Sequence, residues 1–239
     1  MAGTRDIGAP VHDWHPPLRP ERVDLSGRYV RLEPLARAHA GELFAAFEGA
    51  EAVWTFLPYG PFASAQSYAD WIDSAASGDD PLFFALRDFA SGRALGVASY
   101  LRIQPDAGSI ELGHIALSPA LQQSAAATEA WFLMMDWAFS AGYRRFEWKC
   151  NAQNLASRRA AERLGLSYEG TFRQAAVVKG HNRDTAWFAA IDGEWPALRA
   201  AFSRWLDPGN FDAEGRQRES LSALTQPLLA AVDPMRGRA

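Results

Sequence analysis

The stretch from Ser109 to Gly142 restricts the possible folds of this chain most strongly. Its first part, Ser109–Leu117, is an apolar run with β-branched residues, which predicts a strand. From Ala126 onward apolar residues recur at helical spacing, which predicts a helix, and Ser124 stands where an N-cap is expected. A helix that begins among small residues offers free backbone N–H groups to an anion such as phosphate or pyrophosphate. The same pattern fits the strand, loop and helix of any α/β protein, so the rest of the chain must decide between the two interpretations.

The composition limits the class of protein. The chain has 239 residues, of which 48% are hydrophobic, enough for one domain with a sizeable core and extensions. Its net charge of −4 gives no electrostatic reason to expect a nucleic-acid partner. No apolar run approaches the roughly 18 residues of a membrane span, and the N-terminus lacks the apolar core of a signal peptide. The single cysteine, Cys150, excludes an internal disulfide, so we expect a packed thiol in a cytoplasmic protein that has no membrane partner.

The rest of the chain divides into three parts. Residues 1–24 are rich in proline and predict an extended arm, residues 25–206 carry the periodic segments of one domain, and residues 207–239 form a C-terminal extension. Apolar and alternating runs predict seven strands, at residues 29–32, 82–87, 94–103, 109–117, 145–150, 166–178 and 185–191. Helical periodicity predicts five helices, at residues 36–48, 64–77, from 126 onward, 155–164 and 194–206.

The order of these segments predicts an α+β fold of three layers, α/β/α. In it, helices flank both faces of one twisted, mixed and mostly antiparallel sheet of about seven strands. Short turns at residues 91–92 and 106–108 favour antiparallel neighbours, whereas the helix after residue 125 must cross over to a parallel strand. Residues 179–184 predict a turn-rich linker between the last two strands.

Aromatic residues crowd one predicted loop. Residues 54–62 include four aromatic side chains among two prolines and a glycine. Concave binding sites mostly have apolar, aromatic walls, so this loop can line a substrate pocket. It can equally fill the core, and the sequence leaves both interpretations open.

Two sets of motifs stand in the second half of the chain. Residues 122–128 read QQSAAAT, and residues 154–157, 162–166 and 168–170 read NLAS, ERLGL and YEG. The first set resembles the pyrophosphate loop, Q/R-x-x-G-x-G/A, of the GCN5-related N-acetyltransferase (GNAT) superfamily. The second resembles the pattern N-x-x-S, E-R-L-G-F and Y-E-G of its branch similar to the RimJ/RimL ribosomal-protein acetyltransferases. The resemblance extends from about Arg28 to Ile191 and implies the GNAT fold.

The resemblance also implies an enzyme that transfers acetyl from its co-substrate acetyl-CoA to a primary amine, by direct attack in a ternary complex and without a metal. The loop would bind the pyrophosphate, and backbone groups of the preceding strand would meet the pantetheine arm. Asn154 can cap its helix, bind the amide arm of the cofactor, or do both. The implied cofactor-binding residues are Ile115, Ala116, Leu117, Gln122, Gln123, Ser124, Ala125, Ala126, Ala127, Thr128 and Asn154.

Acetyl transfer to an ammonium needs a base, and the departing thiolate needs an acid. Glu111 is the leading candidate base because it lies on the strand that leads to the loop, although an outward-facing carboxylate would look the same in the sequence. His114 is either an alternative base or a structural histidine. For the thiolate the resemblance implies Ser157 or Tyr168, of which Tyr168 can instead be a core aromatic.

The acceptor is left open between a protein N-terminus and a small-molecule amine, because a fold does not choose between them. We expect its contacts at Trp54, Tyr59 and His114, together with the charged turn at residues 179–184. The N- and C-terminal extensions can serve assembly, so a homodimer is a further expectation.

One departure from the family pattern matters. Ala125 stands where the loop usually has its first glycine. Glycine is required where φ is positive or where a Cβ atom would meet the ligand. A second hypothesis is therefore a catalytically silent module of the same fold that binds CoA or another ligand as a sensor.

Overall fold

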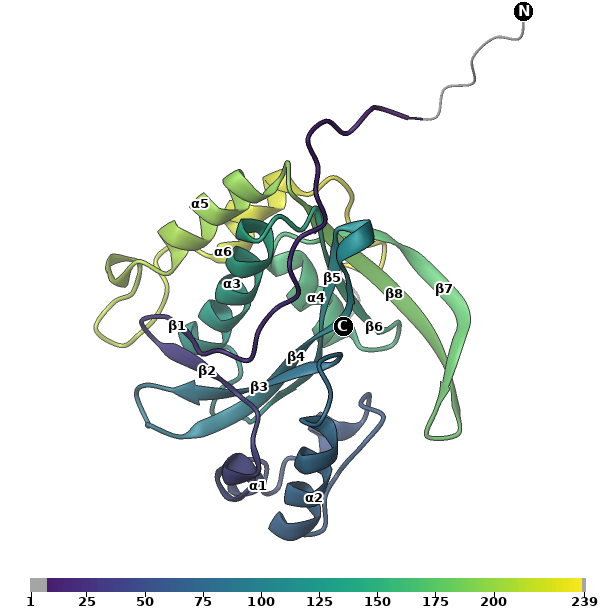
Figure 1. The fold of residues 1–239 in the computed structure, drawn as a ribbon. Helices are drawn as coiled ribbons and strands as arrows, with labels where there is room; N and C mark the ends of the chain where they lie inside the picture. The colour runs from purple at the N-terminus through teal and green to yellow at the C-terminus, as the bar shows by residue number, and fades with distance from the viewer. Residues whose placement is uncertain (1–7, 238–239) are drawn as a thin grey trace, which may run out of the picture.

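One twisted sheet runs through the structure (Figure 1). The computed structural model describes residues 8–237, in which eight strands pair in the order β1-β2-β3-β4-β5-β6-β8-β7. The strands are β1 (Leu25–Ser26), β2 (Val30–Pro34), β3 (Leu82–Asp88), β4 (Ala94–Gln104), β5 (Ser109–Leu117), β6 (Arg145–Asn151), β7 (Ser167–Val178) and β8 (His181–Ile191). Neighbours are antiparallel except β5 and β6, which are parallel. The predicted α+β class with one parallel pair is confirmed, and the two-residue β1 adds an eighth strand at the edge.

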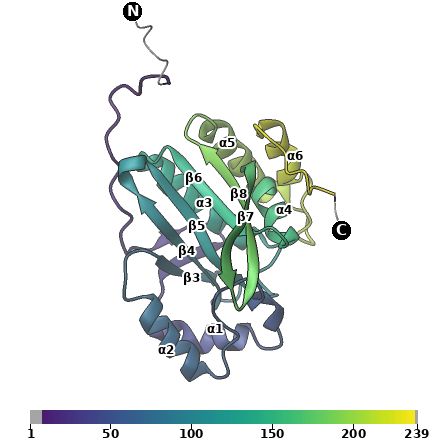
Figure 2. The same ribbon diagram turned by 90° about the vertical axis from the view of Figure 1, so that its right-hand side faces the viewer.

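Helices cover both faces of the sheet, as predicted (Figures 1 and 2). One face carries α3 (Ala125–Ser140), α4 (Leu155–Arg163), α5 (Trp195–Trp205) and α6 (Leu221–Thr225), and the other carries α1 (Ala40–Ala46) and α2 (Ala65–Ala75). Two clusters of buried apolar side chains fill the two interfaces, because successive residues of a strand point to opposite faces. Within residues 8–237 none of the helices is long and apolar enough to cross a membrane.

The predicted strand at residues 109–117 coincides with β5. Ser64 and Ser124 cap α2 and α3 as predicted, each accepting a backbone N–H three residues ahead. Cys150 is buried, as expected. Local signals of this kind, a cap before a periodic run, therefore located the element starts well.

Two predicted boundaries are wrong. The helix expected over residues 36–48 divides into a 3-10 turn, Arg37–His39, and the short helix α1. The linker expected over residues 179–184 is a turn of only two residues, since Val178 pairs directly with His181. Lys179 and Gly180 have positive φ angles of 49° and 77°, the conformation of tight hairpin turns, and β8 begins at His181 rather than at Thr185.

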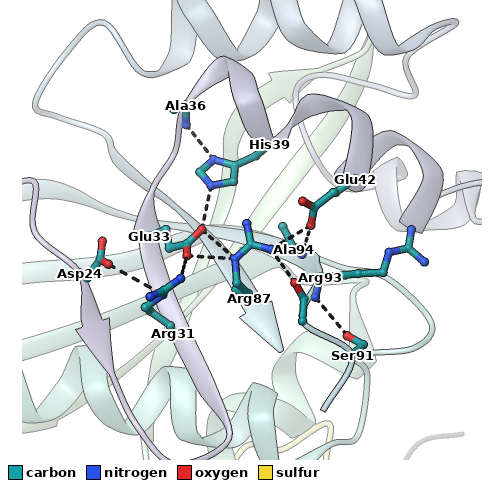
Figure 3. Close-up of polar contacts among 11 residues, drawn as sticks. Asp24, Arg31, Glu33, Ala36, His39, Glu42, Arg87, Ser91, Arg93 and Ala94 are labelled. Atoms are coloured by element: carbon teal, nitrogen blue, oxygen red, sulfur yellow. Dashed lines mark hydrogen bonds and ion pairs between the residues drawn. The ribbon is translucent and has the colours of Figure 1, made fainter. Parts of the chain in front are cut away.

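A polar cluster ties α1 to the sheet (Figure 3). Glu33 of β2 accepts a hydrogen bond from Nε of Arg87 at 2.9 Å, lies 2.9 Å from Nε2 of His39 and pairs with Arg31. Glu42 of α1 accepts a second bond from Arg87, at 3.0 Å. Burial alone would raise the pKa of Glu33, but the hydrogen bonds from Arg87, His39 and Arg31 outweigh it and lower this pKa to about 2. The cluster therefore holds in place the helix that leads into the aromatic residues 54–62.

The C-terminal segment packs against α4. Asp233 and Arg158 are each 3% exposed and form an ion pair, with 2.7 Å between Arg158 Nε and a carboxylate oxygen. The backbone N–H of Asp233 donates to Glu162 at 2.7 Å. The last described residues thus brace the helix whose first turn carries Ser157.

Candidate active site

The parallel strands β5 and β6 separate part-way along their length. Residues 109–112 pair with residues 145–148, although β5 continues to Leu117 and β6 to Asn151. Beyond this point the backbone groups of β5 that face β6 are no longer paired with it. This part of β5 therefore offers a strand edge, on which an extended ligand can bind as a strand does.

A β-bulge turns His114 out of the regular strand. Ala98 of β4 faces two residues of β5, and His114 has a φ of 53°. The His114 ring stacks on Tyr59 with 5.6 Å between centroids, and its Nδ1 lies 3.2 Å from the Tyr59 hydroxyl. Burial, and then the charges of Arg102 and Arg183, lower the pKa of His114 to about 4, so the imidazole is neutral at pH 7. Two residues expected at the acceptor are thus in direct contact.

The loop that follows β5 is closed by its own side chains. Oγ of Ser124 accepts the N–H of Ala127 at 3.0 Å and donates to the carbonyl oxygen of Leu121 at 2.7 Å. The side-chain amide of Gln122 donates to the carbonyl oxygen of Leu117 at 3.0 Å. The Ser124 and Gln122 side chains therefore shape the loop, and its backbone is what remains for a ligand.

Consecutive backbone amides at the start of α3 have no acceptor in the described chain. They belong to Gln123, Ser124, Ala125 and Ala126, whereas the amides of Ala127 and Thr128 bond to Ser124. Free N–H groups at the positive end of a helix dipole attract an anion, and a pyrophosphate presents several acceptor oxygens to such a group. Of the residues predicted for the loop, 123–126 have available amides, whereas the amides of Gln122, Ala127 and Thr128 are occupied.

Ala125 needs no glycine for its backbone. It is the first residue of α3, and the one residue of the loop 118–128 with a positive φ is Gln123, at 56°. The conformational reason for a glycine at position 125 is therefore absent in this chain.

Asn154 and Ser157 lie beside the opening between β5 and β6. Oδ1 of Asn154 accepts the N–H of Ser157 at 3.1 Å, which caps α4. Oγ of Ser157 accepts a hydrogen bond of 3.0 Å from Nε1 of Trp148, the last residue of β6 that pairs with β5. Burial raises the pKa of the neighbouring Cys150 thiol to about 11, so it stays protonated. The hydroxyl of Ser157 is thus in direct contact with the last paired residue of β6.

Tyr168 lies further away, on the edge strand β7. It faces Phe188 of β8, which in turn faces Trp148 of β6. Neighbouring strands are about 4.8 Å apart, so Tyr168 stands about 10 Å from β6 across the sheet. Its hydroxyl lies 3.0 Å from Oγ1 of Thr171, and its ring packs against Phe188. The guanidinium of Arg158, the residue after Ser157, lies 5.5 Å from the centre of the Tyr168 ring.

Glu111 faces the α1 and α2 side of the sheet and is buried, at 3% exposure. Its carboxylate lies 2.8 Å from Nη1 of Arg102 and 2.8 Å from Nζ of Lys149. Lys149 also pairs with Glu147, at 2.6 Å, and its Nζ lies 3.8 Å from the centre of the Trp187 ring. The interpretation of Glu111 as an outward-facing carboxylate is therefore wrong, because the chain neutralises it with two cations.

Comparison with known proteins identifies the family of the chain. A family model described as an acetyltransferase (GNAT) domain matches residues 30–167. The chain belongs to this GNAT acetyltransferase family. A GCN5-related N-acetyltransferase from Brucella melitensis is 50% identical, with 90% of this chain and 100% of that one covered and a TM-score of 0.88.

Other solved structures extend the comparison. A GNAT-family protein from Chromobacterium violaceum is 38% identical, covering 82% of this chain and 100% of that one, with a TM-score of 0.76. The microcin C7 self-immunity acetyltransferase MccE, solved with acetyl-CoA and AMP, is 19% identical, covers 69% and 93%, and has a TM-score of 0.62. That last likeness is one of fold. No curated protein matches the chain.

In this GNAT protein, the aromatic residues 54–62 and the β7–β8 hairpin enclose a cavity of about 400 Å³. Nζ of Lys179 at the hairpin tip donates to the carbonyl oxygens of Trp54, at 2.8 Å, and Gly60, at 2.9 Å. Trp54 is 3% exposed and also packs in the core, so lining a pocket and filling the core are both true of this segment. The cavity is lined by, among others, Trp54, Phe56, Pro61, Asn151, Lys179 and Arg183.

Several residues of the GNAT site were missed in the sequence. Lys149 and Arg102 could have been placed opposite Glu111 only through the pairing of β4, β5 and β6, which no local pattern specifies. Arg183 was assigned to a linker, whereas it lies on β8; a Lys-Gly pair between two apolar runs was the available hairpin signal. Within residues 8–237 no cluster of three or more His, Cys, Asp or Glu side chains is arranged to hold a metal ion.

Proposed function

We propose that this GNAT protein transfers acetyl from acetyl-CoA to a primary amine, by direct attack in a ternary complex. The amine is a protein N-terminus or a small molecule, and the motifs at residues 154–170 favour the branch similar to RimJ/RimL. The observation that carries the proposal is the coincidence of a strand edge beyond residue 112 of β5 with four free amides at the start of α3.

The two features suit two parts of acetyl-CoA. The free amides of residues 123–126 would hold the pyrophosphate at the positive end of the α3 dipole. The backbone of Ile115, Ala116 and Leu117 would pair with the amide arm of pantetheine, with Asn154 beside it. Since Oδ1 of Asn154 is used as a cap, its Nδ2 is the part that can donate to the ligand.

The chemistry then requires two proton movements. The amine nitrogen attacks the thioester carbonyl carbon, the C–S bond breaks, one proton leaves the nitrogen and one reaches the thiolate. We assign the first proton to Glu111, with the neutral His114 as the alternative acceptor. We assign the second to Ser157, with Tyr168 as the alternative donor. Glu111 already pairs with Arg102 and Lys149, so Glu111→Gln is the first variant that tests this assignment.

The second candidate is a catalytically silent module that binds CoA as a sensor. Two observations favour it: the loop at residues 122–128 lacks glycine, and the carboxylate of Glu111 is already neutralised. This candidate shares the cofactor site with the first and differs in turnover alone.

Calorimetric titration with acetyl-CoA tests the shared step. Ala125→Glu places a carboxylate in the first turn of α3, where it favours the helix but repels a pyrophosphate. Ala65→Glu is the matched control, because Ala65 is likewise the first residue after a serine cap, on α2. We expect the native protein and Ala65→Glu to bind acetyl-CoA, and Ala125→Glu to lose about a hundredfold in affinity. Absence of binding by the native protein at millimolar acetyl-CoA would end the proposal.

Thiol release then separates enzyme from sensor. A panel of small amines and of peptides with free N-termini is supplied together with acetyl-CoA, and release of CoA is followed with a thiol reagent. Turnover with any amine supports the enzyme, whereas tight binding without turnover across the panel favours the sensor. A cytoplasmic location and a homodimer stay expectations, which cell fractionation and sedimentation address.

A further inference from the structure

The cavity between residues 54–62 and the β7–β8 hairpin has one cation whose terminal groups are unused. Lys179 spends its ammonium group on backbone carbonyl oxygens of residues 54–60. Arg183 donates from Nε to Oγ1 of Thr185 at 3.2 Å, and its two terminal nitrogens find no acceptor among the described residues. The one acidic side chain of the lining, Glu51, is exposed and is not ion-paired with Arg183.

Arg183 is half-buried and lines this cavity. Residues 183, 185 and 187 of β8 share one sheet face, and β8 pairs with the end of β6 through Thr185 and Asn151. The hairpin tip lies beside the segment that joins α1 to α2 (Figure 2), where Lys179 holds Trp54. Arg183 lines the cavity together with Asn151, the last residue of β6.

The terminal nitrogens of this half-buried guanidinium are available to an anion. The guanidinium has lost part of its water, and its planar fork of N–H groups matches a carboxylate or a phosphate in a bidentate pair. An acceptor amine is itself cationic in water, so a wall that carries Arg183 and Lys179 disfavours a substrate with several ammonium groups. A substrate that carries an anionic group beside its amine supplies the partner that the terminal nitrogens of Arg183 lack.

We propose that the acceptor is a small amine that also carries a carboxylate or a phosphate, and that Arg183 binds this anionic group. The inference rests on the proposed acetyl transfer and narrows its substrate. A cavity of about 400 Å³ has the size of pockets that hold small molecules, and Trp54 and Phe56 give it apolar walls for the rest of the substrate.

The test uses acetylated products, which bind without reacting. N-acetylglycine, N-acetyl-L-leucine and N-acetyl-L-phenylalanine are each compared with the corresponding neutral amide, and N-acetyl-O-phosphoethanolamine with N-acetylethanolamine. Affinities are measured by calorimetry, with and without saturating CoA, for the native protein, Arg183→Gln and Arg173→Gln. Arg173 is the matched control because it is an exposed arginine of the same hairpin that does not line the cavity.

We expect at least one anionic product to bind about tenfold or more tightly than its neutral partner, as charge-assisted hydrogen bonds allow. Arg183→Gln should remove this preference, and Arg173→Gln should keep it. A preference among the amino acid products identifies a carboxylate as the anion, and one in the ethanolamine pair identifies a phosphate. Equal affinity within every pair, or a preference that survives in Arg183→Gln, overturns the inference.

The result is separable from the test of acetyl transfer. If the native protein does not bind acetyl-CoA, the proposed function is wrong. The difference in affinity within each product pair would still show whether Arg183 binds an anionic group. Conversely, turnover with neutral amines and no preference within the pairs would leave an acetyltransferase whose acceptor needs no anion. Thermal unfolding of Arg183→Gln and Arg173→Gln checks that both variants fold.

Discussion

The two sides of the candidate site differ in how the chain builds them. The loop side, residues 118–128 with 154–157, consists of two short segments, each shaped by hydrogen bonds between near neighbours. The hairpin side, residues 54–62 with 174–185, is held by contacts across more than a hundred residues, such as Lys179 to Trp54. Local hydrogen bonds therefore shape the proposed cofactor side, and long-range contacts shape the proposed acceptor side.

This contrast predicts where substitutions act. A change on the loop side should alter cofactor affinity through one strand, one cap or one helix. A change on the hairpin side should alter acceptor choice and leave the cofactor in place. The loop side has one long-range contact, between α4 and Asp233 of the C-terminal segment. The variant with the largest expected effect removes this contact.

Asp233→Ala is expected to have the largest effect on stability. It leaves Arg158, 3% exposed, without its partner, and breaking a buried pair costs about 3–5 kcal/mol. Glu219→Ala in the same C-terminal extension removes an exposed pair with Arg204 and should cost under about 1 kcal/mol. Urea unfolding followed by circular dichroism gives both values, and acetyl-CoA affinity should fall with Asp233→Ala because α4 loses its brace. Equal costs for the two variants would mean that α4 stands without the extension.

Glu111→Gln tests the residue that lies between the two sides. If Glu111 accepts the amine proton, kcat should fall about a hundredfold or more, as for loss of a general base. Glu147→Gln is the control, since Glu147 shares Lys149 with Glu111 and faces it across the parallel pair. The rate is measured by thiol release with saturating acceptor. A similar, small loss in both variants would assign Glu111 a positioning role in the ion cluster, and the proton would then pass to His114.

The contrast also explains how much of the molecule could be predicted from the sequence. Strand β5, the cap at Ser124 and the start of α4 are local patterns, and the structure has them at the predicted residues. The ion cluster of Glu111 and the position of Arg183 follow from strand register, which depends on partners far away in the chain. The contact between Asp233 and Arg158 could not be predicted either, because a carboxylate in an irregular extension carries no periodic signal.

On the hairpin side, acid is expected to loosen the layer that carries the aromatic segment. The pKa of Glu33 is lowered from 4.5 to about 2, so its contribution to stability is complete above about pH 4.5 and is lost as the pH falls toward 2. Glu33→Gln should therefore flatten the dependence of unfolding free energy on pH in this window, with Glu48→Gln, an exposed change near the end of α1, as the control. Identical acid slopes for the native protein and Glu33→Gln would show that the cluster of Figure 3 does not stabilise α1.

The smallest expected effect concerns the loop side at Ala125. Since Ala125 has helical backbone angles, Ala125→Gly gains no conformational freedom that the loop needs and should lower helix stability by about 1 kcal/mol or less. Acetyl-CoA affinity should change by no more than about twofold if the pyrophosphate meets only backbone amides, since no side-chain contact is then removed. Gln123→Gly is the companion, because Gln123 has a φ of 56° and glycine should relieve up to about 1 kcal/mol there. If Ala125→Gly binds acetyl-CoA about tenfold more tightly, the methyl group of Ala125 occupies space that the pyrophosphate needs. This result would favour the sensor hypothesis.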